Sequence, residues 1–378
     1  MATSTAPRRI RAAKAPASTP PPLEGEWAAT DTRLDDLRRY PLPGGHGPED
    51  VVVDLEGRLI TGADDGRLWR WPADTDDAGG GASAGAGAGA GADAGGGGGG
   101  GGGGASAGAA GGGGPAPELV ADTGGRPLGI EVDPRDGSLV VCDAERGLLR
   151  VTGDGTVMPL TDRAAGKPIR FCDNAAVARD GTVYFTDSSD RYGIANWRLD
   201  LLEHRPNGRL LRYDPGSGDT DVVADGLYFP NGVTLTPDES ALLFVETSAH
   251  RLMRVSLDGG SPTQLADLPA YPDNMAAVGD GSYWIALPSP RVASLERLLP
   301  YPRVRQLVAR LPERLQPQPR RYGLAALVDG DGRVLRTLHG PAGEYMMITG
   351  VRQHGSTLWL GSLTESAVAR VSLDAAVG

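Results

Sequence analysis

Three stretches of the 378-residue sequence place oxygen-bearing side chains directly before an apolar, strand-like run. The stretches are RFCDNAAVARDG (170–181), LYFPNGVTLTPD (227–238) and AYPDNMAAVGDG (270–281), and their heads carry Asp173, Asn174, Asn231, Asp273 and Asn274. Carboxylate and amide oxygens, without thiolate or imidazole, are the ligands of hard cations, Ca²⁺ before Mg²⁺ or Mn²⁺. These side chains could hold a divalent cation if the fold brings the three heads together.

A repeat of strands predicts that the three heads do meet. Each copy reads as an apolar strand, an Asp/Gly-rich turn, a second strand and a third strand with a basic residue, and six copies fit between residues 44 and 374. The copies average about 43 residues, within the roughly 40–50 residues of a four-stranded propeller blade. The sequence therefore predicts an all-β fold, a six-bladed β-propeller. A pair of β-sandwiches is the alternative, but it gives no reason for the repeat.

The innermost strand of every propeller blade lines the central channel, so residues at the same phase of each copy converge on the axis. That phase holds Glu49, Leu128, Asp173–Asn174, Asn231, Asp273–Asn274 and Thr349. The predicted metal ligands are Glu49, Asn174, Asn231, Asp273 and Asn274, with Asp173 as a further candidate. Crowded carboxylates without a partner repel one another and are costly to bury, and a bound cation relieves both effects. Each Asn or Asp beside Pro or Gly, taken alone, could simply form a turn. Their common position in successive copies of the repeat favours the metal site instead.

The rest of the chain divides into one domain with two insertions. Residues 1–32 are rich in Ala, Pro, Ser and Arg and are predicted to be a disordered tail, and 33–378 form the single propeller domain. The Gly/Ala segment 76–117 is predicted to be a disordered loop inside a hairpin, because long surface loops add little closure entropy. A strand within 33–43 is expected to complete the last blade and so to close the ring.

The segment 291–321 has helical spacing instead of strand alternation. Its apolar residues are Leu295, Leu298, Leu299, Val304, Leu307, Val308 and Leu311, and it contains eight Arg against two Glu. A basic amphipathic helix can lie on a membrane surface. Three prolines break the segment into short pieces, however, which favours a helical lid over one face of the propeller.

Composition excludes several classes of protein. A net charge of −11 argues against a nucleic-acid partner. No apolar run approaches the roughly 20 residues of a membrane-spanning helix, and the N-terminus lacks the apolar core of a secretory signal. A cytoplasmic protein without a membrane partner is expected, although the N-terminal composition also suits a transit peptide. Cys142 and Cys172 are too few for a disulfide framework and lack zinc-site spacing, so both are expected to be buried thiols.

Five motifs resemble the strictosidine-synthase-like family, which belongs with the gluconolactonase and paraoxonase propellers. They are GPED (47–50), FCDNAAVARDGTVYFTDSSD (171–190), RPNGRLLRYDP (205–215), GLYFPNGVTLTPDES (226–240) and YPDNMAAVGDGSYWIAL (271–287). The resemblance implies a six-bladed propeller with calcium or a similar ion at one end of the channel. Its implied ligands are Glu49, Asn174 or Asp173, Asn231, Asp273 and Asn274.

Two positions depart from the chemistry of the family. Thr349 stands where plant strictosidine synthase depends on a Glu, and Leu128 stands where paraoxonases have a channel His. A threonine is no general base at neutral pH, so the amine–aldehyde condensation is not expected. None of the five histidines falls at a matching phase, and His46, beside GPED, is the nearest candidate.

The sequence thus predicts a calcium-dependent hydrolase of lactones or esters with a small-molecule substrate. Asp273 or Asp173, whichever is not a ligand, is expected to take a proton from water. Asn174, Asn231 and Thr349 are the predicted substrate-binding residues. The alternatives are a propeller that binds a ligand around a stabilising ion without catalysis, and a secondary-metabolism enzyme of the strictosidine synthase type.

Overall fold

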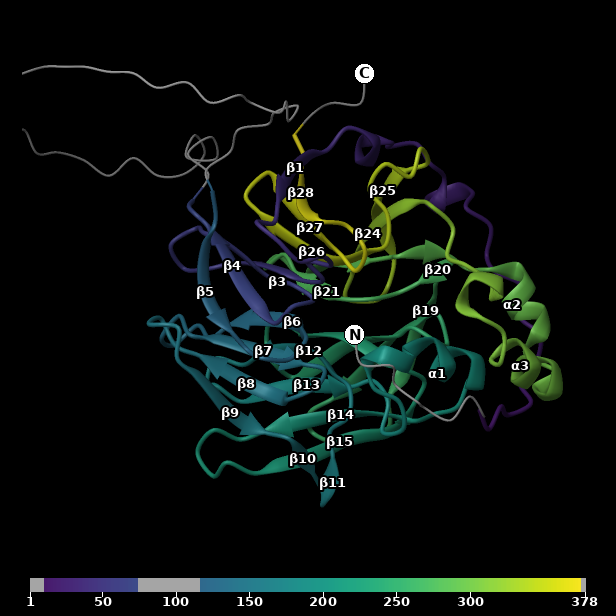
Figure 1. Ribbon diagram of the computed structural model, residues 1–378, viewed down its shortest axis with the longest axis horizontal. Helices are drawn as coiled ribbons and strands as arrows, with labels where there is room; N and C mark the ends of the chain where they lie inside the picture. The colour runs from purple at the N-terminus through teal and green to yellow at the C-terminus, as the bar shows by residue number, and fades with distance from the viewer. Residues whose placement is uncertain (1–9, 74–115, 375–378) are drawn as a thin grey trace, which may run out of the picture.

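The computed structural model describes residues 10–73 and 116–374, which form a six-bladed β-propeller (Figure 1). Each blade is an antiparallel sheet of four strands, so the predicted fold is confirmed. The first three blades, innermost strand first, consist of β2 (Val51–Val53), β3 (Leu59–Gly62), β4 (Arg67–Trp71) and β5 (Glu118–Asp122); β6 (Pro127–Val132), β7 (Leu139–Asp143), β8 (Gly147–Val151) and β9 (Val157–Thr161); and β12 (Cys172–Val177), β13 (Val183–Asp187), β14 (Gly208–Tyr213) and β15 (Thr220–Leu227).

The other three blades follow the same order and close the ring. They consist of β16 (Pro230–Leu235), β17 (Ala241–Glu246), β18 (Arg251–Ser256) and β19 (Thr263–Asp267); β21 (Met275–Ala277), β22 (Ser282–Ala286), β24 (Gly323–Asp329) and β25 (Val334–Gly340); and β26 (Ile348–His354), β27 (Thr357–Ser362), β28 (Ala367–Ser372) and β1 (Arg38–Pro41). Strand β1 pairs with β28, Arg38 opposite Arg370, so the N-terminal strand completes the last blade as predicted and joins the two ends of the ring.

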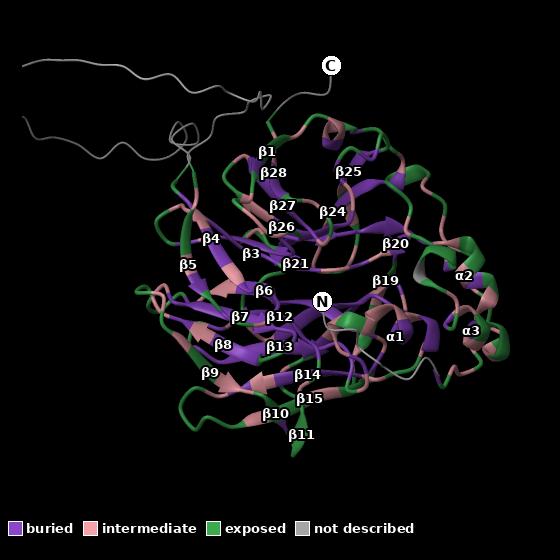
Figure 2. Cartoon of the chain, viewed as in Figure 1, coloured by how far each residue is buried: buried purple, intermediate pink, exposed green. Residues whose placement is uncertain are grey.

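The core lies between neighbouring blades, where both faces of each sheet are covered (Figure 2). Leu148 and Phe185, for example, are both fully buried in a cluster shared by the second and third blades. The same cluster contains Cys142 and Cys172, which are free thiols, so the two cysteines pack as small apolar residues.

The inner strands of four blades begin with an irregularity that matters for function. The register between first and second strands shifts at Pro127/Ile130, Cys172/Ala175, Pro230/Val233 and Ile348/Val351. A bulge of this kind adds residues to one strand and re-aims their side chains. Here it frees two consecutive residues at the head of each inner strand from the regular pairing.

Helices gather on one side of the propeller (Figure 1). Within 291–321 they are α2 (Ala293–Leu298), α3 (Pro302–Val308) and the 3₁₀ turn η5 (Glu313–Leu315), inserted between β22 and β24. The prolines separate these short pieces as the sequence suggested. A further helix, α1 (Trp197–Glu203), follows the turn η4 (Ile194–Asn196) between β13 and β14 and was not predicted. No helix in the described ranges is long and apolar enough to cross a membrane.

The N-terminal segment differs from the expected disordered tail. Residues 10–32 lie on the helical side and along the fifth and sixth blades, with η1 (Gly25–Trp27) and, just beyond, η2 (Arg33–Asp35). Ile10 is buried against Leu199 and Leu202 of α1, and Trp27 is buried in the core of the fifth blade. Two apolar anchors thus order a segment whose average composition suggested disorder.

The predicted Gly/Ala loop joins β4 to β5, which pair directly in the first blade. Its residues 76–115 lie outside the described residues, as do residues 1–9 of the predicted tail, so disorder in both stays a prediction. Two small ribbons complete the fold, β10 (Arg163–Ala164) with β11 (Lys167–Pro168), and β20 (Ala270–Tyr271) with β23 (Ser289–Pro290).

Candidate active site

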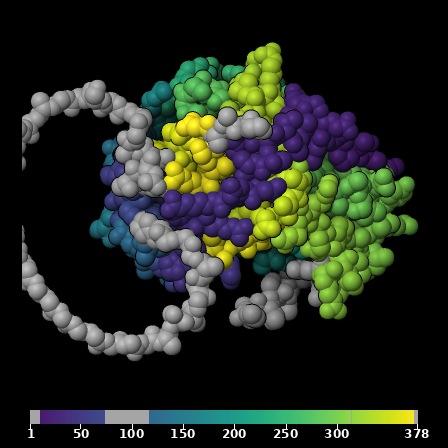
Figure 3. Space-filling model, turned by 90° about the horizontal axis from the view of Figure 1, so that it is seen from above, coloured from purple at the N-terminus to yellow at the C-terminus, as the bar shows by residue number. Residues whose placement is uncertain are grey.

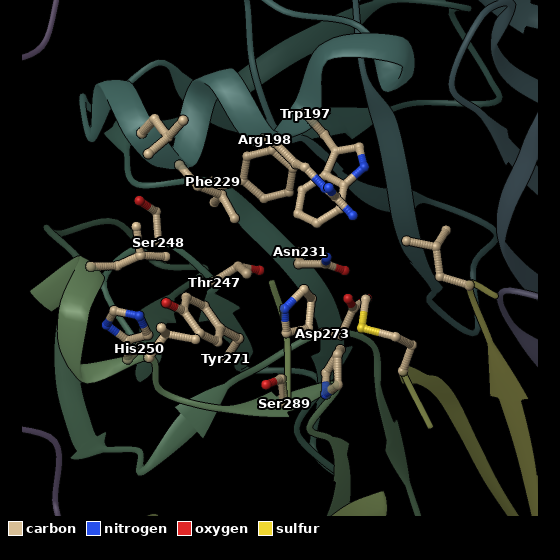
Figure 4. A pocket seen from close by; sticks show the side chains of 18 of the residues that line it. Trp197, Arg198, Phe229, Asn231, Thr247, Ser248, His250, Tyr271, Asp273 and Ser289 are labelled. Carbon is tan, nitrogen blue, oxygen red and sulfur yellow. The ribbon is translucent and has the colours of Figure 1, made fainter. Parts of the chain in front are cut away.

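A pocket lies between the head of the channel and the helices (Figure 4). Its polar floor is formed by the first residue at the head of each inner strand, and these are Glu49, Asp173, Asn231, Asp273 and Thr349, with Leu128 in the remaining blade. Its walls are mostly apolar and include Trp197 and Leu201 of α1 and Leu295 of α2. Figure 4 shows Asn231 and Asp273 between Trp197 on one side and Tyr271 on the other.

The second residue at each head does not line the pocket. Around the ring this position alternates between a polar side chain and glycine, in the order Asp50, Gly129, Asn174, Gly232, Asn274 and Gly350. The alternation has a steric cause, because each glycine lies against the backbone of the next blade. A Cβ on Gly232 would lie 2.4 Å from Met275 N, and one on Gly129 would lie 2.5 Å from Asp173 O. The glycines thus let the strand heads approach closely.

Asn174 and Asn274 therefore occupy other surroundings than the sequence suggested. Asn174 Oδ1 accepts a hydrogen bond from Val233 N at 3.1 Å, and its Nδ2 lies 3.4 Å from Asp50 Oδ2. Asn274 Nδ2 donates to Glu49 Oε2 at 3.1 Å. Within the Asp173–Asn174 pair it is Asp173 that lines the pocket.

Thr349 lines the pocket, but its hydroxyl hydrogen is donated to the protein backbone instead of facing a substrate. Thr349 Oγ1 donates to the backbone oxygen of Glu49 at 2.7 Å, which ties the sixth blade to the first. His46 lies on the exposed surface, outside the pocket.

The three floor carboxylates repel one another in a buried setting. Burial raises the pKa of Glu49 well above its ordinary value, and the charges of Asp273 and Asp173 raise it further. Burial and the charge of Asp173 likewise raise the pKa of Asp273. Burial raises the pKa of Asp173 to about 7, although its hydrogen bond from Ser188 acts the other way. The buried Arg126 guanidinium acts against this shift and lowers the pKa of Glu49, but the net change is upward, so the floor holds protons that isolated carboxylates would release.

Ser188 positions Asp173, and its hydroxyl lies within hydrogen-bond distance of two acceptors although it has only one hydrogen to donate. Its Oγ lies 2.5 Å from Asp173 Oδ2 and 2.6 Å from the backbone oxygen of Pro230. A hydroxyl has one hydrogen and cannot donate to both acceptors. A proton on Asp173 would complete this chain of hydrogen bonds, in agreement with the raised pKa.

Acidic residues at the ends of second strands accept hydrogen bonds from the backbone that leads into the inner strands, and so hold the heads of those strands in position. Asp187 accepts hydrogen bonds from Phe171 N at 2.9 Å and from Arg170 N at 3.2 Å, and its other oxygen forms a buried ion pair with Arg209 at 2.5 Å. Glu246 has the equivalent place in the next blade and accepts from Tyr228 N at 2.6 Å. These two carboxylates are thus strand-end supports and not part of the floor.

The floor fits a hard divalent cation, judged from its own unsatisfied atoms. Asn231 Oδ1 is buried and has no hydrogen-bond partner among the described residues. In the described part of the chain, no His, Cys, Asp and Glu side chains form by themselves a group of three that could hold an ion. An amide oxygen would therefore have to complete a ligand set at this floor, and that of Asn231 lines the pocket beside Glu49 and Asp273, whereas the equally unpartnered Oδ1 of Asn274 does not.

Two histidines of the wall were missed by sequence reasoning. His204, directly after α1, has its Nδ1 3.0 Å from Ser248 Oγ, and burial lowers its pKa to about 4, so that the ring is neutral at pH 7. His250, in the turn after β17, lies 3.4 Å from Glu296 Oε1 of α2. Both come from connections between second and third strands, which a search restricted to the heads of inner strands does not reach.

Comparisons with known proteins agree with the fold and the motifs. A family model described as strictosidine synthase matches residues 173–259, and one described as strictosidine synthase-like, N-terminal, matches 25–71. Strictosidine synthase-like protein 6 of Arabidopsis thaliana is 38% identical over 259 residues, which cover 68% of this chain and 69% of that protein. Strictosidine synthase-like protein 13 is 37% identical over 254 residues, 65% of this chain and 60% of the relative, so the match spans less than two thirds of that protein.

A solved structure supports the architecture independently of close sequence similarity. The structure of a gluconolactonase from Xanthomonas campestris superposes with a TM-score of 0.57 at 18% identity, covering 96% of this chain and 99% of that one. With the motifs, the two family models and the relatives above, these findings show that the chain belongs to the strictosidine synthase-like family of six-bladed β-propellers.

Proposed function

We propose that this protein is a divalent-cation-dependent hydrolase of lactones or esters, with calcium as the favoured ion. The observation that carries the proposal is the buried floor of three repelling carboxylates beside the unpartnered oxygen of Asn231, at the bottom of an apolar pocket. The gluconolactonase described above supports it as a structural neighbour only, since the identity is 18%.

Glu49, Asn231 and Asp273 would hold the cation, because they combine two carboxylates with an amide oxygen that lines the pocket and has no hydrogen-bond partner among the described residues. Asn274 Oδ1 is also buried without such a partner, but Asn274 does not line the pocket. A cation at such a floor polarises a bound carbonyl, stabilises negative charge on its oxygen and acidifies water. Mg²⁺ and Mn²⁺ are the other ions that suit these ligands.

Asp173 is then the residue that accepts a proton from water. Ser188 holds Asp173 Oδ2 in place, and no described residue donates a hydrogen bond to Oδ1, so this oxygen is the one available for the proton. A carboxylate in hydrogen-bond reach of water can act as a general base for its attack on a carbonyl. Asp273 would have less freedom for this role, because it would be a ligand together with Asn231 and Glu49.

The walls indicate the class of substrate. Trp197, Phe229 and Leu201 surround the floor with apolar surface, so a substrate with a large apolar part is favoured over a free sugar acid. Binding of that part would bring the lactone or ester group to Asn231 and Asp273 (Figure 4).

A propeller that binds an apolar ligand around an ion without turnover is the second candidate. Leu128 and Thr349 favour it, because these positions carry no group that could transfer protons. The secondary-metabolism enzyme of the strictosidine synthase type lacks such support, since the same Thr349 replaces the Glu on which that condensation depends.

One experiment separates these functions. Purified protein is analysed for metal and then assayed with lactones and aryl esters of increasing acyl length, with calcium or with chelator. The hydrolase proposal expects turnover that rises with acyl length, disappears with chelator and falls at least about 10²-fold in Asp273→Asn. The control Asp331→Asn removes an exposed carboxylate and should change nothing. Bound metal without turnover of any substrate would refute hydrolysis and leave the binding propeller.

A further inference from the structure

The outer side of the helical lid exposes apolar side chains. Tyr301, Val304, Leu307 and Leu315 are 59%, 42%, 61% and 61% exposed. Nine large apolar residues are exposed in the described part of the chain, and these four fall within fifteen consecutive positions. A single exposed leucine needs no explanation, but a cluster of this kind marks an interaction surface.

Arginines surround this apolar cluster. Arg297, Arg303, Arg310 and Arg314 are exposed, and no ion pair joins them to a described carboxylate. The chain as a whole carries a net charge of −11, so a positive patch runs against its general character. We call the four arginines and the four apolar residues together the outer lid surface.

Two other arginines of the segment are buried and hold the lid to the propeller. Arg305 donates to the backbone oxygen of Leu202, at the end of α1, at 2.8 Å. Arg291 forms a buried ion pair with Glu296 at 2.9 Å. The arginines of the outer lid surface are therefore not needed for this anchoring, and the helices present them outward from a fixed base.

The inner side of the same helices lines the pocket. Leu295 and Leu299, at the start and just past the end of α2, are pocket-wall residues, while Leu307 of α3 faces outward. The lid is thus a thin layer with the pocket on one side and the outer lid surface on the other, and in Figure 3 its green atoms form a projecting edge of the molecule.

We propose that the outer lid surface docks on an anionic lipid surface. Apolar side chains beside arginines that pair with no described carboxylate suit the boundary between acyl chains and phosphate headgroups. The helices are too short to enter deeper, at six and seven residues for α2 and α3. A symmetric contact between two copies is disfavoured, because it would bring the same arginines face to face. The proposal departs from the expectation of no membrane partner, which favoured a lid over a membrane-surface helix for this segment and stays untested.

Docking would place the pocket wall directly behind the lipid interface. An apolar substrate dissolved in the lipid would then be held within the thickness of the lid from the pocket. This consequence rests on the proposed hydrolase, but the docking itself does not, and its test uses no turnover.

The test measures flotation of the full chain with phosphatidylcholine vesicles, with and without phosphatidylserine, in chelator so that calcium cannot bridge protein and lipid. Binding is expected only with phosphatidylserine and should weaken with salt. Leu307→Asp is expected to lower the partition coefficient about tenfold, and Arg303→Glu with Arg310→Glu by more than about tenfold.

Matched controls lie on turns at the opposite end of the blades. Leu55→Asp changes a leucine that is 63% exposed, and Arg179→Glu with Arg333→Glu makes the same charge change as the lid pair. Both control variants should bind vesicles like the native chain. Equal loss in lid and control variants would overturn the proposal, since it would reduce binding to net charge.

Absence of vesicle binding in the native chain would also overturn docking. So would a dimer in solution that Leu307→Asp dissolves, because a second copy would then be the occupant of this surface. Melting curves of each variant verify folding, which is expected to be unchanged for side chains this exposed. Vesicle binding by a chain that cleaves no ester would support docking and refute only the hydrolase.

Discussion

The substitution Asp173→Asn should stabilise the protein when no cation is present. Burial raises the pKa of Asp173 to about 7 from an ordinary 3.8. This difference corresponds to roughly 4 kcal/mol between the folded and unfolded chain once the group is fully ionised. Asparagine keeps the shape and can still accept from Ser188, but it carries no charge.

The sign of the effect depends on pH. The folded-state pKa lies above the unfolded value, so the folded chain binds more protons between about pH 4 and pH 7. The free energy of unfolding of the native chain should therefore fall as the pH rises through this window. Asp173→Asn lacks the titration, so the variant should match the native chain near pH 4 and exceed it by about 2–4 kcal/mol at pH 8, allowing for relaxation of the site.

Urea unfolding in chelator at pH 4.5, 6 and 8 measures this difference, with Asp331→Asn as the exposed control. Added calcium should shrink the advantage of Asp173→Asn, because a bound cation offsets the same repulsion in the native chain. A variant that is less stable than the native chain at pH 8 in chelator, or a difference independent of pH, would refute the electrostatic account of the floor.

Three other perturbations test the surroundings of the floor. Removing calcium should lower the melting temperature of the native chain by about 5–10 °C, and Glu49→Gln should lose most of that response in a thermal-shift assay. Arg209→Met leaves Asp187 charged and buried, so unfolding in urea should show a loss of about 3–5 kcal/mol; a loss below 1 kcal/mol would contradict a buried pair. Gly232→Ala adds a Cβ that would lie 2.4 Å from the backbone of the next blade and should cost at least about 1–3 kcal/mol with loss of calcium binding. Its control is Gly153→Ala, which meets no atom within 4 Å and should be nearly silent in both assays.

The parts of the site that repeat could be predicted from the sequence. Glu49, Asp173, Asn231, Asp273 and Thr349 share one phase of a blade-length repeat, and the structure brings them to one floor because the ring brings equal phases to one axis. The phase alone could not show which of two consecutive residues, such as Asp173 and Asn174, lines the pocket. The choice between the two residues of each head depends on a bulge and on close backbone contacts that a regular strand pattern does not encode.

The parts that do not repeat were harder to predict. Helix α1 is an insertion seen once, so no other blade provides a template for it, and His204 follows that helix. Ile10 and Trp27 order the N-terminal segment through single anchors, whereas a composition average responds to the many Ala and Pro residues around them. In each case one long-range contact outweighs a local signal.

The close packing of the strand heads supports the proposed cation, because it keeps the floor carboxylates near one another. At Gly232 and Gly350 neighbouring backbones approach too closely to admit a Cβ, so the strand heads that carry Glu49 and Asp273 are packed directly against the adjoining blades. The apolar walls limit screening by water. The Arg126 guanidinium offsets part of the charge at Glu49; protons or a bound cation would offset the rest, and at neutral pH these two would compete for the same oxygens. An ion that wins this competition meets ligands already in place, because the blades and not the ion determine their positions.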